Sequence, residues 1–290
     1  MRKLQDLNIT DKRVFLRGDI DVPLTSRKIK RNKENDGDVE IAVEDDTRLQ
    51  DLVPTIRFLL EKNCQIILAG HLDRPGGRVN FSLSTKHIIS VLSSLLNIDI
   101  VHFTSADSVK LAKNTLGLFE NLRFWPGEES NDEEFAKQLA NLTDVYVNEA
   151  FAVSHRQHAS IVGVPKFLPH AAGFRLQKEV EVLSHVLQNP KRPQVVIIGG
   201  VKLETKLPLI ENLAKTANWV LIGGLIAEEA RRENLQFPKN VILANLTEDR
   251  KDITDQSIEK FKEKIKTAGQ IIFNGAMGVF EKDQHAEGTR

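Results

Sequence analysis

The sequence predicts an α/β protein made of two units with mainly parallel sheets. Three observations support this prediction. Short apolar runs alternate with longer amphipathic segments, this alternation restarts after one long helical segment, and 290 residues are enough for two ordinary domains. Hydrophobic residues make up 41% of the chain and charged residues 28%, a balance typical of globular proteins that bury a sizeable core.

The first half contains the alternation in its clearest form. The helix expected at 46–63 places Leu52, Ile56, Leu59 and Leu60 on one face. A second helix, at 84–97, has Ser84 or Thr85 as its N-terminal cap. A third is expected at 132–142. Residues 13–23 are interpreted as a strand that enters a loop, and strands are expected at 64–72, 98–103 and 144–151. The charge-rich segment 26–40 is interpreted as a solvated loop.

A long helix is expected at 174–189, since Asn189-Pro190 and Pro193 end it. After it come strands at 194–200, 219–224, 240–244 and 270–275, with helices at 206–217, 227–234 and 253–268. We therefore expect domains at 1–170 and 190–290 joined by the helix 171–189. The second half has fewer strands than the first and ends where a further helix would begin, so the second domain is expected to be incomplete.

Composition excludes several classes of protein. Forty basic residues balance forty acidic ones, so no overall field indicates nucleic acid or anionic membrane as a partner. The single cysteine, Cys64, rules out an internal disulfide framework and a cysteine-based metal cluster. The N-terminal segment lacks the apolar core of a signal peptide, and no apolar run reaches membrane-spanning length. A cytoplasmic protein is the expectation.

Basic side chains recur where the predicted strands of the first half end. Ligands bind outside the carboxyl ends of parallel strands, and arginine forms fixed hydrogen bonds to phosphate and carboxylate. Each arginine alone is more typical of a surface ion pair, whereas the set together favours a site for a small polyanion. No spacing fits a zinc site or a Ser-His-Asp triad. The set comprises Arg17, Asp19, Asp21, Arg48, His71, Arg74, Arg123, His155, Arg156 and His158.

The strands of the second half end in glycine: Gly199-Gly200, Gly223-Gly224 and Asn274-Gly275. Glycine lets backbone N–H groups approach a phosphate, but none of these turns matches the P-loop or dinucleotide patterns. Lys202 and Lys206 would share a helical face if a helix begins near Lys202. From these residues alone, an ordinary turn is at least as well supported as a phosphate site.

Several motifs in order resemble phosphoglycerate kinase: "GHLDRPGG", "FENLRF", "DVYVNEAFAVSHRQHAS", "IIGGVKLETKLPLIENL" and "FNGAMGVFE". The resemblance runs from residue 12 to the last residue. It implies two Rossmann-like three-layer domains joined by a long helix, in a cytoplasmic monomer. It also implies 3-phosphoglycerate or 1,3-bisphosphoglycerate on the first domain, Mg²⁺ with ADP or ATP on the second, and phosphoryl transfer on hinge closure.

The resemblance also assigns roles to single residues. Asp19 and Asp21 would face the glycerate hydroxyl and carboxylate, and Arg48, nearest the transferring group, would act with Lys202 and Lys206 in catalysis. The lysines would bind nucleotide phosphates and the moving phosphoryl group. The acid and its non-transferring phosphate would be surrounded by His71, Arg74, Arg123 and Arg156. On the nucleotide side, Gly223 and Gly224 would lie near adenine, Asn274 near the phosphates, and Glu281 would bind ribose.

The sequence departs from the family at several places. Asp21 stands where Asn is usual, Asp73 where Gly is usual, Leu225 where a third Gly is usual, and Ala276 where Pro is usual. The "GGGDT"-like loop that carries the Mg-nucleotide aspartate is absent, and the stretch between the second and third glycine turns is short. Two hypotheses result. The chain is an active kinase or a fragment of one, or a non-catalytic relative that binds phosphoglycerate or another polyanion. A structural or interaction role is a third and weaker option.

Overall fold

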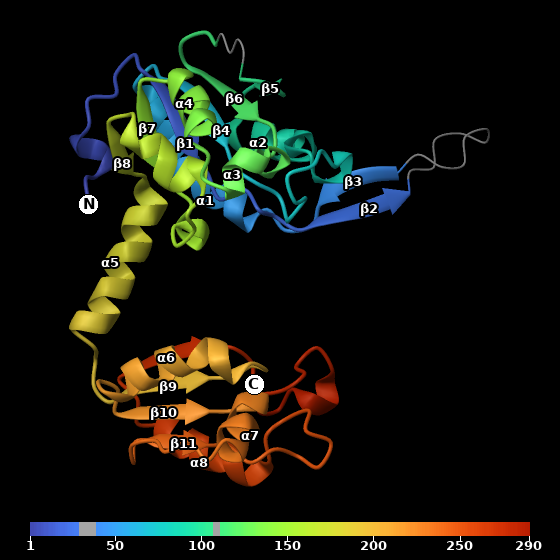
Figure 1. Ribbon diagram of the computed structural model, residues 1–290, viewed down its shortest axis with the longest axis vertical. Helices are drawn as coiled ribbons and strands as arrows, with labels where there is room; N and C mark the ends of the chain where they lie inside the picture. The colour runs from blue at the N-terminus through green and yellow to red at the C-terminus, as the bar shows by residue number, and fades with distance from the viewer. Residues whose placement is uncertain (29–38, 107–110) are drawn as a thin grey trace. The chain divides into compact units, whose positions relative to one another are not determined.

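The computed structural model describes residues 1–28, 39–106 and 111–290. The chain forms two compact units, unit 1 at 1–182 and unit 2 at 183–290. Helix α5 (Phe174–Gln188) contains the division between them (Figure 1). The proline-based prediction of where this helix ends is confirmed, because Asn189 and Pro190 follow its last residue.

Unit 1 contains a six-stranded parallel sheet with the order β5-β6-β4-β1-β7-β8. Its strands are β1 (Arg13–Arg17), β4 (Gln65–Ala69), β5 (Ile100–Phe103), β6 (Thr115–Phe119), β7 (Val145–Asn148) and β8 (His170–Ala172). Because every pair is parallel, the carboxyl ends of all six strands meet at one edge of the sheet.

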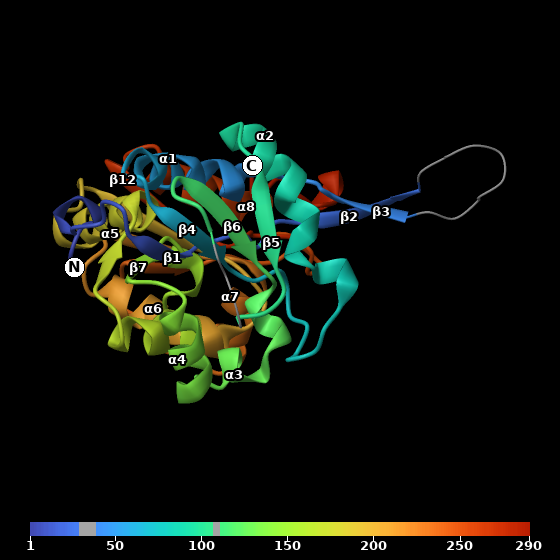
Figure 2. The ribbon, with the colours of Figure 1, turned by 90° about the horizontal axis from the view of Figure 1, so that it is seen from above.

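Helices cover both faces of this sheet. Helices α1 (Thr47–Glu61) and α2 (Ile89–Leu96) lie on one face, and α3 (Pro126–Glu129) and α4 (Glu133–Asn141) on the other (Figure 2). The alternation along β1 shows why: Val14 and Leu16 pack toward α1, while Phe15 between them packs toward α4. The predicted three-layer arrangement is therefore confirmed in unit 1.

Unit 1 also contains strands that periodicity did not predict. Strand β6 was missed because Gly117 interrupts its apolar run; a side chain there would meet the Phe103 ring. Strand β8 has only three residues.

The predicted loop at 26–40 is wrong at both ends, because β2 (Leu24–Lys28) pairs antiparallel with β3 (Val39–Val43). Both faces of a two-stranded ribbon can face water, so a charge-rich sequence can still form one. Residues 29–38 of that prediction lie outside the described residues.

Unit 2 has a smaller parallel sheet with the order β11-β10-β9-β12. Its strands are β9 (Gln194–Ile198), β10 (Trp219–Ile222), β11 (Val241–Leu243) and β12 (Gln270–Asn274). Helices α6 (Leu203–Ala214) and α7 (Gly224–Arg232) pack on one face and α8 (Asp255–Ile265) on the other. On the edge strand β12, Ile271 and Phe273 are 48% and 53% exposed, consistent with the expectation of a smaller second sheet.

Two predicted helix starts in unit 2 are wrong by three residues. Helix α6 begins at Leu203 rather than 206, and α7 begins at Gly224 rather than 227. Helix α7 thus begins within its glycine turn, where the low helix propensity of Gly224 hides the start, and α6 begins shortly after Gly200. In the parts of the chain that the structure describes, no helix has the length and apolar character needed to cross a membrane.

Candidate active site

A cavity of about 470 Å³ in unit 1, here called the basic pocket, collects most of the predicted acid-binding residues. It lies at the carboxyl ends of the strands, where the loops after β1, β4, β6 and β7 meet. Parallel pairing brings these loops together although they are far apart in the sequence. The pocket is lined by Asp21, Arg48, His71, Asp73, Arg74, Arg123, Ala152, Val153, His155 and Arg156.

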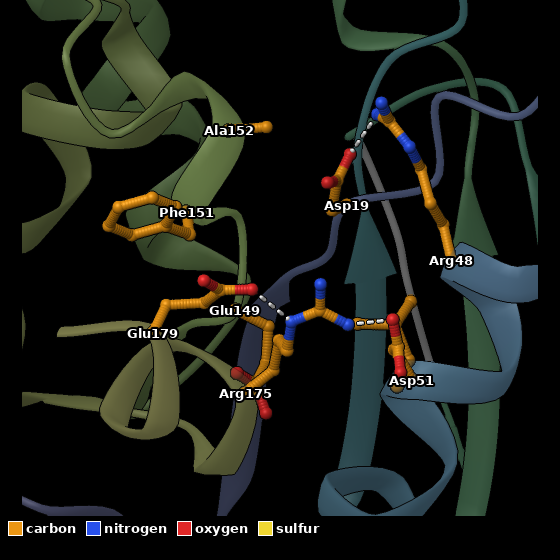
Figure 3. Close-up of a pocket in the computed structure, with 9 residues that line it drawn as sticks. Asp19, Arg48, Asp51, Glu149, Phe151, Ala152, Arg175 and Glu179 are labelled. Carbon is orange, nitrogen blue, oxygen red and sulfur yellow. Dashed lines mark hydrogen bonds and ion pairs between the residues drawn. The ribbon is translucent and has the colours of Figure 1, made fainter. Parts of the chain in front are cut away.

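Arg48 is held at the rim of this pocket by the start of α1. Asp45 accepts a hydrogen bond from the Thr47 N–H (2.8 Å), which fixes the first turn, and Arg48 Nη1 donates to Asp19 Oδ1 (2.9 Å). Asp19 lies in an adjoining cavity rather than in the basic pocket (Figure 3). Of the residues that the resemblance assigns to the acid, only Asp19 is thus absent from the lining, and Asp19 instead contacts Arg48.

His71 is buried, with 2% of its surface exposed, and sits beside the wholly buried Arg17. Arg17 Nη2 is 3.1 Å from His71 Nδ1. Because a guanidinium only donates, Nδ1 must accept and the proton must be on Nε2, which is 3.5 Å from Asp21 Oδ2. Burial, with Arg17 and Arg123 nearby, lowers the pKa of His71 to about 2. His71 therefore offers a neutral N–H donor at the pocket and not a positive charge.

This burial makes stability depend on pH. Below the ordinary pKa of 6.5 the unfolded chain binds a proton at His71 that the folded chain does not bind. The stabilising contribution is therefore complete above that value and is lost as the pH falls. Lowering the pH from about 7.5 to about 5.5 is expected to reduce the free energy of unfolding by about 1.4 kcal/mol through His71.

Urea unfolding of the wild type and of His71→Asn at both pH values measures this term. Burial also lowers the pKa of His102 and of His158, so the difference between the two proteins isolates His71. The same pH dependence in both proteins would contradict the burial argument.

Two carboxylates, Asp21 and Asp73, distinguish this pocket from the family pattern. Asp21 Oδ1 accepts the Asp73 N–H (2.8 Å), which ties the loop after β1 to the loop after β4. Asp73 has a left-handed backbone (φ +50°), which explains why glycine is usual there. Its carbonyl accepts from Arg123 Nη1 (2.8 Å). The Asp21 carboxylate and the Asp73 backbone therefore both hold these loops in place, while each carboxylate adds negative charge to the pocket.

The four arginines of the pocket fall into two groups. Arg48 and Arg123 are anchored, Arg48 to Asp19 and Arg123 to the Asp73 carbonyl and to Glu129 (3.2 Å). Within residues 1–28, 39–106 and 111–290, no carboxylate pairs with Arg74 or Arg156. These two guanidinium groups are exposed at the pocket and available to an anionic ligand.

In unit 2, Lys206 and Asn274 lie together: Lys206 Nζ donates to Asn274 Oδ1. The predicted common helical face of the two lysines is only partly realised. Lys206 is on α6, whereas Lys202 is the residue before the helix and has an extended backbone. Lys202 is exposed.

A second cavity of unit 2, of about 240 Å³, is here called the glycine-lined pocket. It contains the predicted Gly224 and Glu281 but not Gly223, Lys202, Lys206 or Asn274. Its lining is Gly200, Val201, Gly224, Leu225, Arg250, Lys251, Ala276, Met277, Gly278, Val279, Phe280 and Glu281.

The glycine turns of unit 2 have a structural explanation of their own. Gly224 has φ +62°, and a Cβ atom there would lie 2.6 Å from the Gly200 carbonyl oxygen. A Cβ atom at Gly199 would clash with the Ala276 carbonyl. The ends of β9, β10 and β12 thus approach each other at backbone distance, which only glycine allows. A role of Gly223 and Gly224 beside adenine stays a prediction.

Two features of the sites were missed by sequence reasoning. Glu149, read only as part of a strand, is a buried carboxylate that accepts hydrogen bonds from Thr55 and from the Leu176 N–H (2.9 Å) at the start of α5. Arg250 and Lys251 line the glycine-lined pocket. None of the recognised motifs covers residues 233–252, and the only local signal was the cluster of polar residues between two apolar segments.

An arginine-rich pocket in unit 1 and a glycine-lined pocket in unit 2, each at the carboxyl ends of parallel strands, are the features expected of a two-domain phosphotransferase. The sequence profile of the family described as phosphoglycerate kinase matches residues 4–231 and 230–290. The chain belongs to the phosphoglycerate kinase family.

Individual relatives agree with this assignment. Phosphoglycerate kinase of Finegoldia magna is 34% identical, with 99% of this chain and 84% of the relative covered. The cytosolic phosphoglycerate kinase 3 of Arabidopsis thaliana is 36% identical, with 99% and 82% covered. Among solved structures, phosphoglycerate kinase from Coxiella burnetii matches with a TM-score of 0.78 and 28% identity, covering 99% of this chain and 83% of that one.

Proposed function

We propose that the basic pocket of unit 1 binds 3-phosphoglycerate or 1,3-bisphosphoglycerate, and that unit 2 binds ADP or ATP at the ends of β9, β10 and β12. As a member of its family, the enzyme transfers a phosphoryl group reversibly between 1,3-bisphosphoglycerate and ADP, a step of glycolysis. The observation that carries the proposal is the convergence of four arginines on one cavity, with Arg74 and Arg156 unpaired within the described residues.

The chemistry of the reaction suits these side chains. Phosphoryl transfer depends on positioning and on stabilising negative charge on the transferred oxygens, and needs no covalent catalyst from the protein. Arg74, Arg123 and Arg156 would hold the acid and its non-transferring phosphate, and the His71 N–H would donate a hydrogen bond. Arg48 would stabilise charge at the transferring group, and Lys202 and Lys206 would do so from the nucleotide side.

Magnesium would enter with the nucleotide. Within the described ranges, no group of three or more His, Cys, Asp or Glu side chains is placed to hold a metal ion. Mg²⁺ commonly keeps several waters and binds through substrate phosphates with few protein ligands. The ion would neutralise phosphate charge when bound, and no protein ligand is assigned to it here.

The binding proposal is tested by calorimetric titration of the whole chain with 3-phosphoglycerate. Arg156→Gln is expected to weaken binding at least tenfold, because a hydrogen bond to a charged group contributes about 1.5–3 kcal/mol. Arg78→Gln is the matched control, since Arg78 is an exposed arginine of unit 1 outside the pocket. Absence of binding by the wild type, or equal binding by both variants, would overturn the assignment.

Three further expectations stay proposals. The first is the domain division, in which residues 1–170 bind phosphoglycerate, residues 171–189 form the connecting helix and residues 190–290 bind the nucleotide. The second is a monomeric state. The third is a cytoplasmic location, which the cytosolic relative supports. None of the relatives reported above supports the alternative of a non-catalytic binding protein.

A further inference from the structure

The turn Thr247–Asp252 forms part of the wall of the glycine-lined pocket, and the roles proposed above do not use it. It lies in the connection between β11 and α8, and two of its residues, Arg250 and Lys251, line the pocket. Gly224 and Glu281, the residues predicted for adenine and ribose, line the same pocket. Cationic side chains thus reach the place expected for the nucleoside.

The backbone of this turn is firmly placed. Arg250 has φ +61°, a left-handed conformation that costs an ordinary residue about 1 kcal/mol or more. Hydrogen bonds hold it there: Arg250 N–H to the Thr247 carbonyl (2.9 Å), and Thr247 N–H to the Asp252 carbonyl (2.9 Å). The Lys251 carbonyl accepts from the Val279 N–H (2.8 Å), which joins the turn to the opposite wall of the pocket.

The side chain of Arg250 is held by an ion pair, but some of its N–H donors have no partner among the described residues. Its Nε and Nη2 atoms contact Glu228 Oε2 at 2.8 and 2.7 Å. A guanidinium carries five N–H donors, and Nη1 has no hydrogen-bond partner among the residues that the structure describes. Arg250 is 60% exposed. Glu228 therefore orients a planar group whose remaining donors are free at the rim of the pocket.

We propose that Arg250 contacts the nucleoside part of the bound nucleotide and that Glu228 is its positioning residue. This inference rests on the proposed nucleotide role of unit 2. The predicted phosphate ligands Lys202, Lys206 and Asn274 lie outside the pocket, so its occupant is the nucleoside end. A planar guanidinium can stack on a purine or donate to its ring nitrogens and to ribose oxygens.

The test is calorimetric titration of the whole chain with ADP and, separately, with adenosine. Arg250→Met keeps an unbranched side chain of similar length and is expected to raise the Kd of both ligands about tenfold. Arg232→Met is the matched control, because Arg232 is an exposed arginine of α7 that pairs with Glu229 and lies outside the pocket. Its Kd values are expected to stay within about twofold of the wild type.

The possible results separate this inference from the proposed function. If the wild type binds ADP and Arg250→Met binds both ligands equally well, only the inference is overturned. A loss with ADP but not with adenosine would indicate a phosphate contact and would also overturn it. A wild type that binds neither ligand would refute the nucleotide role itself. Glu228→Ala, which removes the acceptor that orients Arg250 but keeps Arg250 itself, is expected to weaken binding of both ligands by a smaller factor than Arg250→Met.

Discussion

Replacing Glu149 by alanine is expected to lower the free energy of unfolding of unit 1 by about 3–4 kcal/mol. Glu149 is 1% exposed and joins three elements: it follows β7, accepts from Thr55 on α1, and accepts from the Leu176 N–H at the start of α5. Alanine would leave the Thr55 hydroxyl and the Leu176 N–H without their acceptor and would open a cavity beside Gly173.

The electrostatics of Glu149 limit this effect but do not reverse it. Burial raises the pKa of Glu149 above its ordinary value, while the hydrogen bonds from Thr55 and from the first turn of α5 act against burial. A carboxylate at a helix N-terminus is also favoured by the helix dipole. Replacing Glu149 by alanine removes the cost of burying its charge, which the hydrogen bonds already offset in part. It also removes those hydrogen bonds, and this loss has the larger effect on the free energy of unfolding.

Fluorescence can report the unfolding of unit 1 alone. The two tryptophans are Trp125 in unit 1 and Trp219 in unit 2, so a Trp219→Phe background leaves only the Trp125 signal. Glu179→Ala is the control, because Glu179 lines the same cavity as Glu149 but forms a partly exposed ion pair with Arg175 (Figure 3). Its loss is expected to cost less than about 1 kcal/mol. An equal decrease in the free energy of unfolding in the two variants would contradict the structural role of buried Glu149.

Replacing Lys206 by methionine is expected to lower kcat by about 100-fold to 1,000-fold, because a positioned cation that stabilises transition-state charge contributes on this scale. Lys206 is in the first turn of α6, and its ammonium group contacts Asn274, the last residue of β12. Two residues expected at the nucleotide phosphates thus meet at the ends of neighbouring strands. The KM for 3-phosphoglycerate is expected to change much less than kcat.

Helix α6 itself offers a control for this experiment. Lys215, at the C-terminal end of the helix, also has an asparagine contact, with Asn212 Oδ1 at 3.4 Å, but it is exposed and outside the glycine turns. Lys215→Met is expected to leave kcat unchanged, and Trp219 fluorescence checks that unit 2 remains folded in both variants. A Lys206→Met enzyme with wild-type kcat would remove this lysine from catalysis.

The clearest successes of sequence reasoning concern elements with strong periodicity. Helix α1 and the strands β1, β4 and β9 were predicted because apolar spacing is local and survives in any tertiary context. Short, interrupted or charged segments were not predicted. Strand β6 contains Gly117, strand β8 has only three residues, and the β2–β3 ribbon is charged. In these cases pairing with a neighbouring strand, rather than local pattern, decides the structure.

The convergence of Arg48, Arg74, Arg123 and Arg156 was also predictable, since parallel strands must bring their carboxyl ends to one edge. The individual role of each side chain was not. His71 has a typical position for an anion ligand, yet burial beside Arg17 keeps it neutral. Asp73 breaks the family pattern, yet its left-handed backbone and its carbonyl bond to Arg123 show how the loop retains its shape.

The sequence by itself therefore determined the class of fold, the family and the set of residues that gather at the strand ends. Those properties depend on local periodicity, on motif order and on the general rule for parallel sheets. Only the tertiary structure decided that Glu149 ties α1 and α5 together and that the glycines of unit 2 pack against each other. It also decided that Arg250 reaches a pocket lined by Gly224 and Glu281. Burial, ionisation and pairing depend on which distant segments come into contact, and no single stretch of sequence contains that information.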